Sequence, residues 1–285
     1  IINFPVSDLF CELIGYYLAE GHVQMCGGFR AKSRSVLSFC FAWDEEEYVK
    51  DLQFILSKII SKVGRVEEHE GSFRTLIVNS LPLSSFLIEH FGLGCLNKRI
   101  PRWFMLLPFE KQSKMIKTYW RGDGYYQNKF RSRYFGMTTI SEQLAWGVTK
   151  MLERGGYAPL LLKRERLNRH KAFDVFLTGH QIERFTKLLE IEVEYSRNRS
   201  WQEIHNDGNY VYRPIRWIGK KLVENLDVFN LEISKDNSYT ANGIVVHNCW
   251  HIQNGASCKG ERCEGYSEAY EEWWRQTHFD CEVCG

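Results

Sequence analysis

Apolar and polar positions along the chain follow an order of helix and strand patterns. Residues 8–20 predict a helix that Asp8, after Ser7, can cap, and residues 45–61 predict an amphipathic helix from apolar positions at helical spacing. Turn residues such as Glu70 and Gly71 separate runs that predict strands. The expected order is helix 8–20, strands 22–32 and 36–43, helix 45–61, strands 64–70 and 73–79, and helix 81–91.

The same order begins again near residue 112. The expected elements are helix 112–122, strands 125–135 and 136–139, helix 141–153, strands 157–167 and 173–178, and helix 181–189. A repeat with a period of about one hundred residues predicts one pseudo-symmetric domain of two αββαββα units, which is an α+β fold.

The character of the chain changes after Glu190. Short β-rich segments at 210–218, 228–233 and 239–246 are separated by Gly, Asp and Asn, and they predict a small all-β unit. From Cys249 the chain is acidic and rich in cysteine. The predicted domains are therefore 1–95, 96–195, 196–248 and 249–285.

Charge and composition limit the function classes. Residues 1–224 contain 33 basic and 25 acidic residues, which favours a nucleic-acid partner, although many basic domains bind none. No apolar run approaches the roughly 18 residues of a membrane span, and the start does not resemble a signal peptide. These features predict a cytoplasmic protein without a membrane partner. Cys11, Cys26, Cys40 and Cys95 have apolar or mixed neighbours in the sequence and are expected to be reduced core residues. The odd total of nine cysteines argues against a secreted disulfide framework.

Two predicted helices end in the same way, each with a carboxylate just before a glycine. In residues 13–21 (LIGYYLAEG) the acid is Glu20, and in residues 116–124 (IKTYWRGDG) it is Asp123. Each helix also has small residues four positions apart, which share one face and permit close helix packing. The two carboxylates would then meet and offer hard oxygen ligands to Mg²⁺ for phosphodiester hydrolysis. The alternative is that both are ordinary acidic residues at helix ends.

These segments resemble the paired motifs of the LAGLIDADG homing endonucleases, in the two-motif dodecapeptide (DOD-type) form found inside inteins. The resemblance covers about residues 8–190, and it implies a Mg²⁺-dependent, monomeric DNA endonuclease with Glu20 and Asp123 as catalytic metal ligands. Residues 97–104 resemble the family's Lys-x-Ile-Pro segment, which gives Lys98 an accessory catalytic role; a solvated linker charge is the alternative. Thr118 stands where the family has Gly or Ala, and it is expected to loosen the helix packing.

The resemblance also implies double-stranded DNA lying across the two sheets. Because alternate side chains of a strand share one face, strand residues after each motif are the candidate contacts. A solvated outer face is the alternative for each of them. The candidates are Gln24, Arg30, Lys32 and Arg34 in the first half, and Gln127, Lys129, Arg131, Arg133, Lys163, Arg164 and Arg166 in the second.

Residues 228–233 and 237–249 resemble the C-terminal splicing blocks of an intein, with a Hint-type fold. The resemblance makes Asn248 the last intein residue, whose side-chain amide attacks its own carbonyl to form a succinimide. His247 would polarise that carbonyl or protonate the leaving amine, and Cys249 would be the +1 nucleophile. Asn230 and Asn237 stand where the family often has Asp and His, which is expected to slow cyclisation.

An intein also needs an upstream Cys or Ser nucleophile and a Thr-x-x-His segment, but position 1 is Ile. The expectation is a truncated sequence or a split element whose partner is a separate N-terminal intein half, with C-terminal cleavage alone still open. The tail would be a host (C-extein) fragment, and two cysteine pairs in it resemble a Zn²⁺ site. They are Cys258, Cys263, Cys281 and Cys284.

The sequence therefore predicts an intein-associated homing endonuclease that makes a site-specific double-strand cut in DNA, joined to the C-terminal part of a splicing element. The alternative is a splicing element whose endonuclease has decayed to a DNA-binding or structural insert.

Overall fold

The computed structural model describes residues 4–26, 34–129, 132–179, 181–193, 205–207, 210–212, 219, 238–241 and 244–247. Contacts divide the chain into two units, Ile1–Trp217 and Ile218–Gly285. None of the described helices is long and apolar enough to cross a membrane.

The first half of the larger unit has the element order that its sequence predicts. The elements are α1 (Asp8–Glu20), β1 (Gly21–Cys26), β2 (Arg34–Ala42), α2 (Glu46–Ile60), β3 (Arg65–His69), β4 (Phe73–Val78) and α3 (Leu81–Phe91). The cap of α1 is Ser7 rather than Asp8, because the Ser7 hydroxyl accepts a hydrogen bond from the backbone N–H of Phe10 at 3.1 Å. Strand β2 begins at Arg34, two residues before the start of the expected strand 36–43.

The second half repeats this order after a short additional helix. The elements are α4 (Arg102–Met105), α5 (Phe109–Asp123), β5 (Gly124–Lys129), β6 (Ser132–Thr139), α6 (Glu142–Arg154), β7 (Leu160–Arg164), β8 (Ala172–Thr178) and α7 (Gln181–Leu189). The predicted break between strands at residues 135 and 136 is wrong, because Phe135 and Gly136 are both inside β6, paired with Tyr126 and Tyr125.

Each half forms one antiparallel four-stranded sheet, and the two sheets have matching strand orders. The orders are β1-β2-β4-β3 and β5-β6-β8-β7. This confirms the α+β class and the repeated layout. In both sheets, alternate residues on one face, such as Phe39 and Leu76 or Phe135 and Val175, are buried against the helices. The residues between them lie on the opposite face, which we call the open face.

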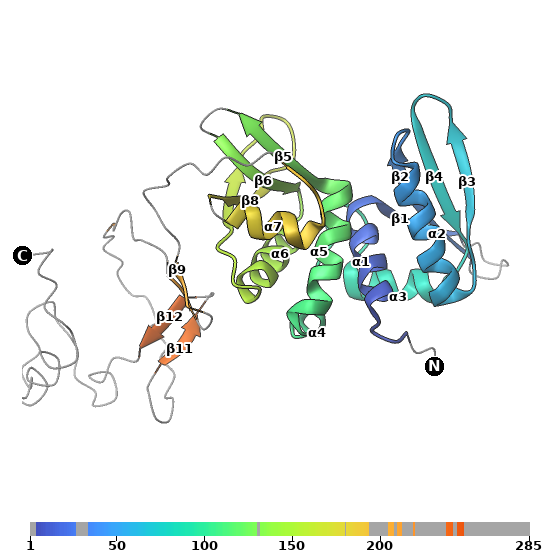
Figure 1. Ribbon diagram of the computed structural model, residues 1–285. Coiled ribbons are helices and arrows are strands. Elements are labelled where there is room, and N and C mark those ends of the chain that lie inside the picture. The colour runs from blue at the N-terminus through green and yellow to red at the C-terminus, as the bar shows by residue number, and fades with distance from the viewer. Residues whose placement is uncertain are drawn as a thin grey trace, which may run out of the picture. The chain divides into compact units, whose positions relative to one another are not determined.

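Helices α1 and α5 pack side by side between the two sheets (Figure 1). Their small residues face each other: a Cβ built on Gly15 would lie 1.9 Å from the hydroxyl oxygen of Thr118, and one on Gly122 would lie 2.6 Å from the Cβ of Ala19. The expectation that Thr118 loosens this packing is wrong. Its hydroxyl donates to the Glu12 carbonyl of α1 at 2.8 Å, so it ties the two helices together.

Several expectations for cysteines and for the C-terminal region change. Cys11 is buried as expected, but Cys40 and Cys95 are exposed, and the side chain of Cys26 lies outside the described residues. The described residues of the C-terminal region include two short hairpins: β9 (His205–Asn206) with β10 (Val211–Tyr212), and β11 (Ser238–Ala241) with β12 (Ile244–His247). The single strand expected at 239–246 is therefore two strands. Residues 228–233 lie outside the described part of the chain.

We expect Gly15→Ala to lower the free energy of unfolding by about 1–3 kcal/mol, because the new methyl group meets backbone atoms of α5, including the Met115 carbonyl at 2.4 Å. Denaturant unfolding measures this change. The matched control is Gly147→Ala in α6, where the nearest atoms are side-chain atoms of Ile100 at 3.0 to 3.2 Å. Its strain is offset by about 1 kcal/mol of helix propensity, so it should be near neutral. Equal losses in both variants would contradict close packing at Gly15.

Candidate active site

Two carboxylates lie at the ends of the packed helices. Glu20 is the last residue of α1 and Asp123 the last of α5, and each helix passes directly into an extended glycine that starts a strand. The last turn of α5 contacts the first acid, since a Cβ on Gly122 would lie 2.6 Å from the Oε1 atom of Glu20. The structure therefore brings together the two acids that the sequence singled out.

Both carboxylates are held in surroundings that favour the protonated form. Burial, followed by the charges of Asp123 and Glu45, raises the pKa of Glu20 from 4.5 to about 7. Burial also raises the pKa of Asp123 from 3.8 to about 6, although the Lys98 charge and a hydrogen bond with the buried Tyr119 side chain oppose this rise. Two acids crowded in a partly buried site are poised to take a cation.

Lys98 lies beside these acids rather than on a solvated linker. Its side chain is buried, and its Nζ atom donates to the carbonyl oxygens of Leu18 at 2.8 Å and Ala19 at 3.2 Å, in the last turn of α1. Burial lowers the pKa of Lys98, while the charges of Asp123 and Glu20 raise it. The Ser141 hydroxyl, which caps α6, donates to the Lys98 carbonyl at 2.5 Å and fixes the segment to the second half.

The donor set suits a hard divalent cation. Mg²⁺ is commonly held by one or two carboxylates, with water and substrate phosphate oxygens completing the coordination. Across the described ranges no group of three or more His, Cys, Asp or Glu side chains could hold a metal ion. Glu20 and Asp123, two neighbouring carboxylates, are the residues that would hold such a cation.

The strand candidates for DNA contact separate into three groups. Gln24, Gln127, Lys129 and Arg164 lie on the open faces, and the register puts Arg34 there too, although its side chain lies outside the described residues. Arg133 and Lys163 lie on the opposite face at strand ends, and Arg166 is in the loop after β7. Arg30, Lys32 and Arg131 lie outside the described residues.

The expected strand 125–135 would place Lys129, Arg131 and Arg133 on one face, and this expectation is wrong. Lys129 is the last residue of β5, whereas Arg133 lies in β6, where it pairs with Asn128 and donates to the side-chain oxygen of Asn128 at 2.9 Å. Lys129 and Arg133 therefore lie on opposite faces of the sheet.

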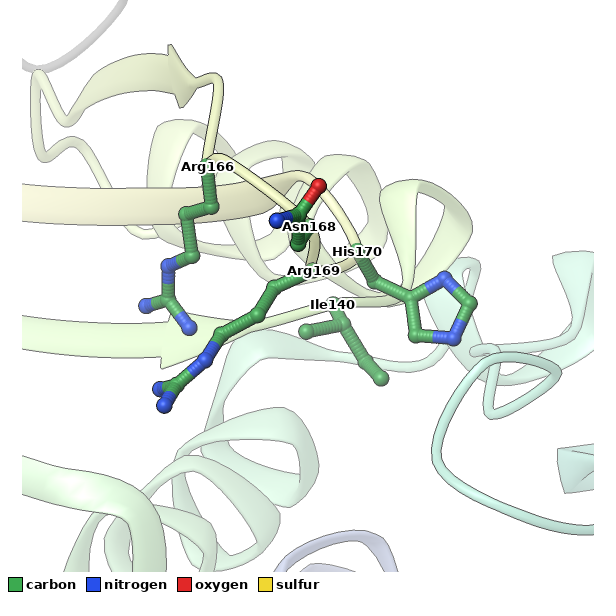
Figure 2. Close-up of a pocket in the computed structure, with 5 residues that line it drawn as sticks. All are labelled: Ile140, Arg166, Asn168, Arg169 and His170. Carbon is green, nitrogen blue, oxygen red and sulfur yellow. The ribbon is translucent and has the colours of Figure 1, made fainter.

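A basic pocket of 670 Å³ lies at the loop between β7 and β8. Its lining residues are Ile140, Arg166, Asn168, Arg169 and His170. Figure 2 shows the guanidinium groups of Arg166 and Arg169 on one side of the loop, with the imidazole of His170 directed away from them. The sequence reasoning missed Arg169 and His170, although the density of basic residues over 163–171 was a visible signal.

The splice-junction and tail candidates fall almost entirely outside the described residues. For His247 only the backbone is described, at the end of β12. Asn248, Cys249, Cys258, Cys263, Cys281 and Cys284 all lie outside the described part.

Residues 110–190 match the family described as a LAGLIDADG-like domain. The match begins in α5, which carries Asp123, and runs to the end of α7. The solved structure of I-DmoI in complex with DNA and Mn has a TM-score of 0.50 with this chain at 13% identity, covering 66% of this chain and all of I-DmoI. I-DmoI is a homing endonuclease. The larger unit thus has the LAGLIDADG homing endonuclease fold.

The curated relatives are much longer proteins with unlike names. The ATP-dependent DNA helicase Hel308 of Thermococcus kodakarensis is 26% identical over 86% of this chain and 22% of its own length. An iron–sulfur cluster assembly SufBD family protein of Mycobacterium tuberculosis, Rv1461, is 28% identical over 84% of this chain and 27% of its own length. The chain spans less than a third of either relative.

We expect Glu20→Gln to stabilise the metal-free protein above pH 7. A carboxyl whose pKa is raised on folding supports the fold below its ordinary pKa and loses that contribution as the pH rises through the folded value. For Glu20 this window runs from 4.5 to about 7. In a chelator, the melting temperature of the variant should exceed that of the wild type by about 2–4 °C above pH 7, and the two should converge below 4.5.

The control is Glu89→Gln, on an exposed glutamate of α3. This variant should show the same change in melting temperature between low and high pH as the wild type. A Glu20→Gln curve parallel to that of the wild type at every pH would contradict the crowding of the two acids.

Proposed function

We propose that the chain is a metal-dependent, site-specific DNA endonuclease that cuts both strands. The observation that carries this proposal is the meeting of Glu20 and Asp123 at the ends of α1 and α5, with the buried Lys98 beside them. The fold supports it, because homing endonucleases share it. The two halves provide both sheets within one chain, so we propose that the monomer is the active form.

Each group at the site has a distinct part in phosphodiester hydrolysis. When bound, a divalent cation such as Mg²⁺ would supply Lewis-acid polarisation of the phosphate and a nucleophilic water at neutral pH. Glu20 and Asp123 would hold this cation, and Tyr119, which hydrogen-bonds with Asp123, orients the Asp123 carboxylate. Lys98 has three N–H donors and gives two to the Leu18 and Ala19 carbonyls, so the third can donate to a phosphate oxygen.

Double-stranded DNA would lie against the open faces of the two sheets. Gln24, Gln127 and Arg164 are side chains there with the donors and acceptors that read base edges in the major groove. Lys129 is exposed at the end of β5, and its charge suits a backbone phosphate.

We also propose that the endonuclease belongs to an intein. A shared segment that makes up only 22% of a helicase and 27% of an iron–sulfur assembly protein suits an insert whose function is independent of its hosts. The β11–β12 hairpin supports this reading, because β12 holds the backbone extended up to His247. Asn248 would then cyclise with the help of His247, and Cys249 would be the +1 nucleophile.

Two further proposals concern the N-terminal splicing residues and the cysteine-rich tail. The N-terminal splicing residues would come from another segment or from a separate intein half. The tail from Cys249 would be host sequence, and its Cys258, Cys263, Cys281 and Cys284 would bind Zn²⁺.

We expect the protein to cut, in Mg²⁺, a plasmid that carries the host coding sequence without the insert. Asp123→Asn should reduce the cleavage rate at least about 100-fold, because the metal site contributes several kcal/mol to transition-state stabilisation. The rate of double-strand cleavage on agarose gels measures this. Lys98→Met should retain DNA binding and also lose activity.

The matched control is Glu12→Gln, since Glu12 is a half-buried carboxylate of the same helix α1 whose pKa is also raised by burial. It should cut at the rate of the wild type. A folded wild type that binds this plasmid but never cuts it would contradict the endonuclease and favour a decayed insert.

We expect slow cleavage after Asn248 to release the 37-residue fragment that begins at Cys249. Asn248→Ala should abolish the release, and His247→Ala should slow it about 100-fold or more, as expected for loss of a general acid or base. Mass spectrometry of the incubated protein measures both fragments. Asn242→Ala is the control and should still cleave; release that persists in Asn248→Ala would rule out cyclisation.

A further inference from the structure

A buried carboxylate lies on the open face of the second sheet, where a DNA-binding surface would need to be neutral or positive. Asp174 of β8 is only 4% exposed. Its position alternates with those of Phe173 and Val175, whose side chains pack against the helices. Burying a carboxylate is costly unless it is paired, so its partners show how it is used.

Two side chains from neighbouring strands converge on one oxygen of Asp174. The Thr138 hydroxyl of β6 donates to its Oδ1 atom at 2.7 Å, and the NH2 group of Arg164 of β7 donates to the same atom at 2.8 Å. Tyr125 of β5 in turn hydrogen-bonds with Thr138. The network therefore crosses all four strands of the sheet.

The fold itself does not require this carboxylate. The first strand of each half begins with Gly21 or Gly124, and these pair with Phe39 and Met137 respectively. The residue after Phe39 in β2 is Cys40, and the residue after Met137 in β6 is Thr138. Cys40 pairs with Thr75 of β4, and Thr138 pairs with Asp174 of β8. Thr75 therefore occupies the position in the first sheet that Asp174 occupies in the second, so the fold does not need an acid there. We look for the role of Asp174 among its own contacts.

That role follows from the geometry of Arg164. Its side chain is 54% exposed, whereas that of Asp174 is 6% exposed, so the carboxylate lies beneath a guanidinium that remains accessible. Guanidinium has five N–H donors in a planar fork, and the bond to Asp174 uses one of them. The charged hydrogen bond fixes the direction of the fork in advance, which lowers the entropy lost on binding. An arginine fork held in this way matches the O6 and N7 acceptors of guanine.

We infer that Arg164 reads a guanine of the DNA target, and that Asp174, supported by Thr138, is the positioning residue that aims it. This inference rests on the proposed DNA-binding function. It makes Asp174 a determinant of sequence preference at one base pair, although Asp174 itself need not contact the DNA.

The test selects bound duplexes from a DNA library with a randomised centre, using the full chain in Ca²⁺, followed by sequencing. The wild type should select a guanine at one position that Arg164→Lys no longer prefers. The preference should fall by about 5- to 150-fold, the discrimination that one bidentate pair provides. Asp174→Asn should weaken the same position and leave the other positions unchanged.

The matched control is Glu165→Gln, which also removes one negative charge close to Arg164 in the sequence. Glu165 forms its ion pair with Lys171 and not with Arg164. This variant should leave the profile unchanged. A loss of affinity in Asp174→Asn that is equal for all sequences would mean a purely structural role and would overturn the inference. An unchanged base preference in Arg164→Lys, the variant that keeps Asp174, would also overturn the inference. A wild type that selects no sequence at all would instead refute the proposed DNA recognition.

Discussion

The close approach of α1 and α5 is the constraint on which the rest of the structure depends. Gly15 and Gly122 leave no space for a side chain at the contact, and Thr118 adds a hydrogen bond across it. The contact extends to the last turn of both helices, where Gly122 meets Ala19 and Glu20, so the terminal acids of the two helices lie in one site. The sheets begin directly after those acids, so the same contact also sets where the two open faces begin. A second link, between Arg121 of α5 and Asp51 of α2 at 2.9 Å, joins the halves away from the acids.

The two acids of the candidate active site lower the stability of the fold at this contact. Burial raises the pKa of both Glu20 and Asp123, and the Asp123 charge raises that of Glu20 further, which disfavours the charged forms that bind a cation. Lys98 offsets part of this repulsion, but burial lowers its own pKa. Such a cluster stores unfavourable electrostatic energy that cation binding releases, which is a common property of functional sites.

The sequence predicted the repeat, most elements and the meeting of the two acids, because helix periodicity and the small residues before each acid are local signals. It failed where long-range pairing decides. The break between the two strands was placed at residues 135 and 136, although β5 ends at Lys129 and β6 begins at Ser132, because the sequence between these two residues contains no glycine or proline to mark a strand end. Asp174 was missed because its role depends on hydrogen bonds from Thr138 and Arg164, which lie on other strands. Lys98 could be assigned only by resemblance, since its burial depends on the carbonyls of α1, some eighty residues away in sequence.

The central claim is that Glu20 and Asp123 form a single cation site, and Mn²⁺ binding followed by electron paramagnetic resonance tests it most directly. The wild type, Glu20→Gln, Asp123→Asn and the double variant would be titrated under the same conditions. The account predicts that either single substitution removes the same bound Mn²⁺ and that the double variant loses no more. Independent, additive losses in the two single variants, or retention of the bound Mn²⁺ in the double variant, would contradict it.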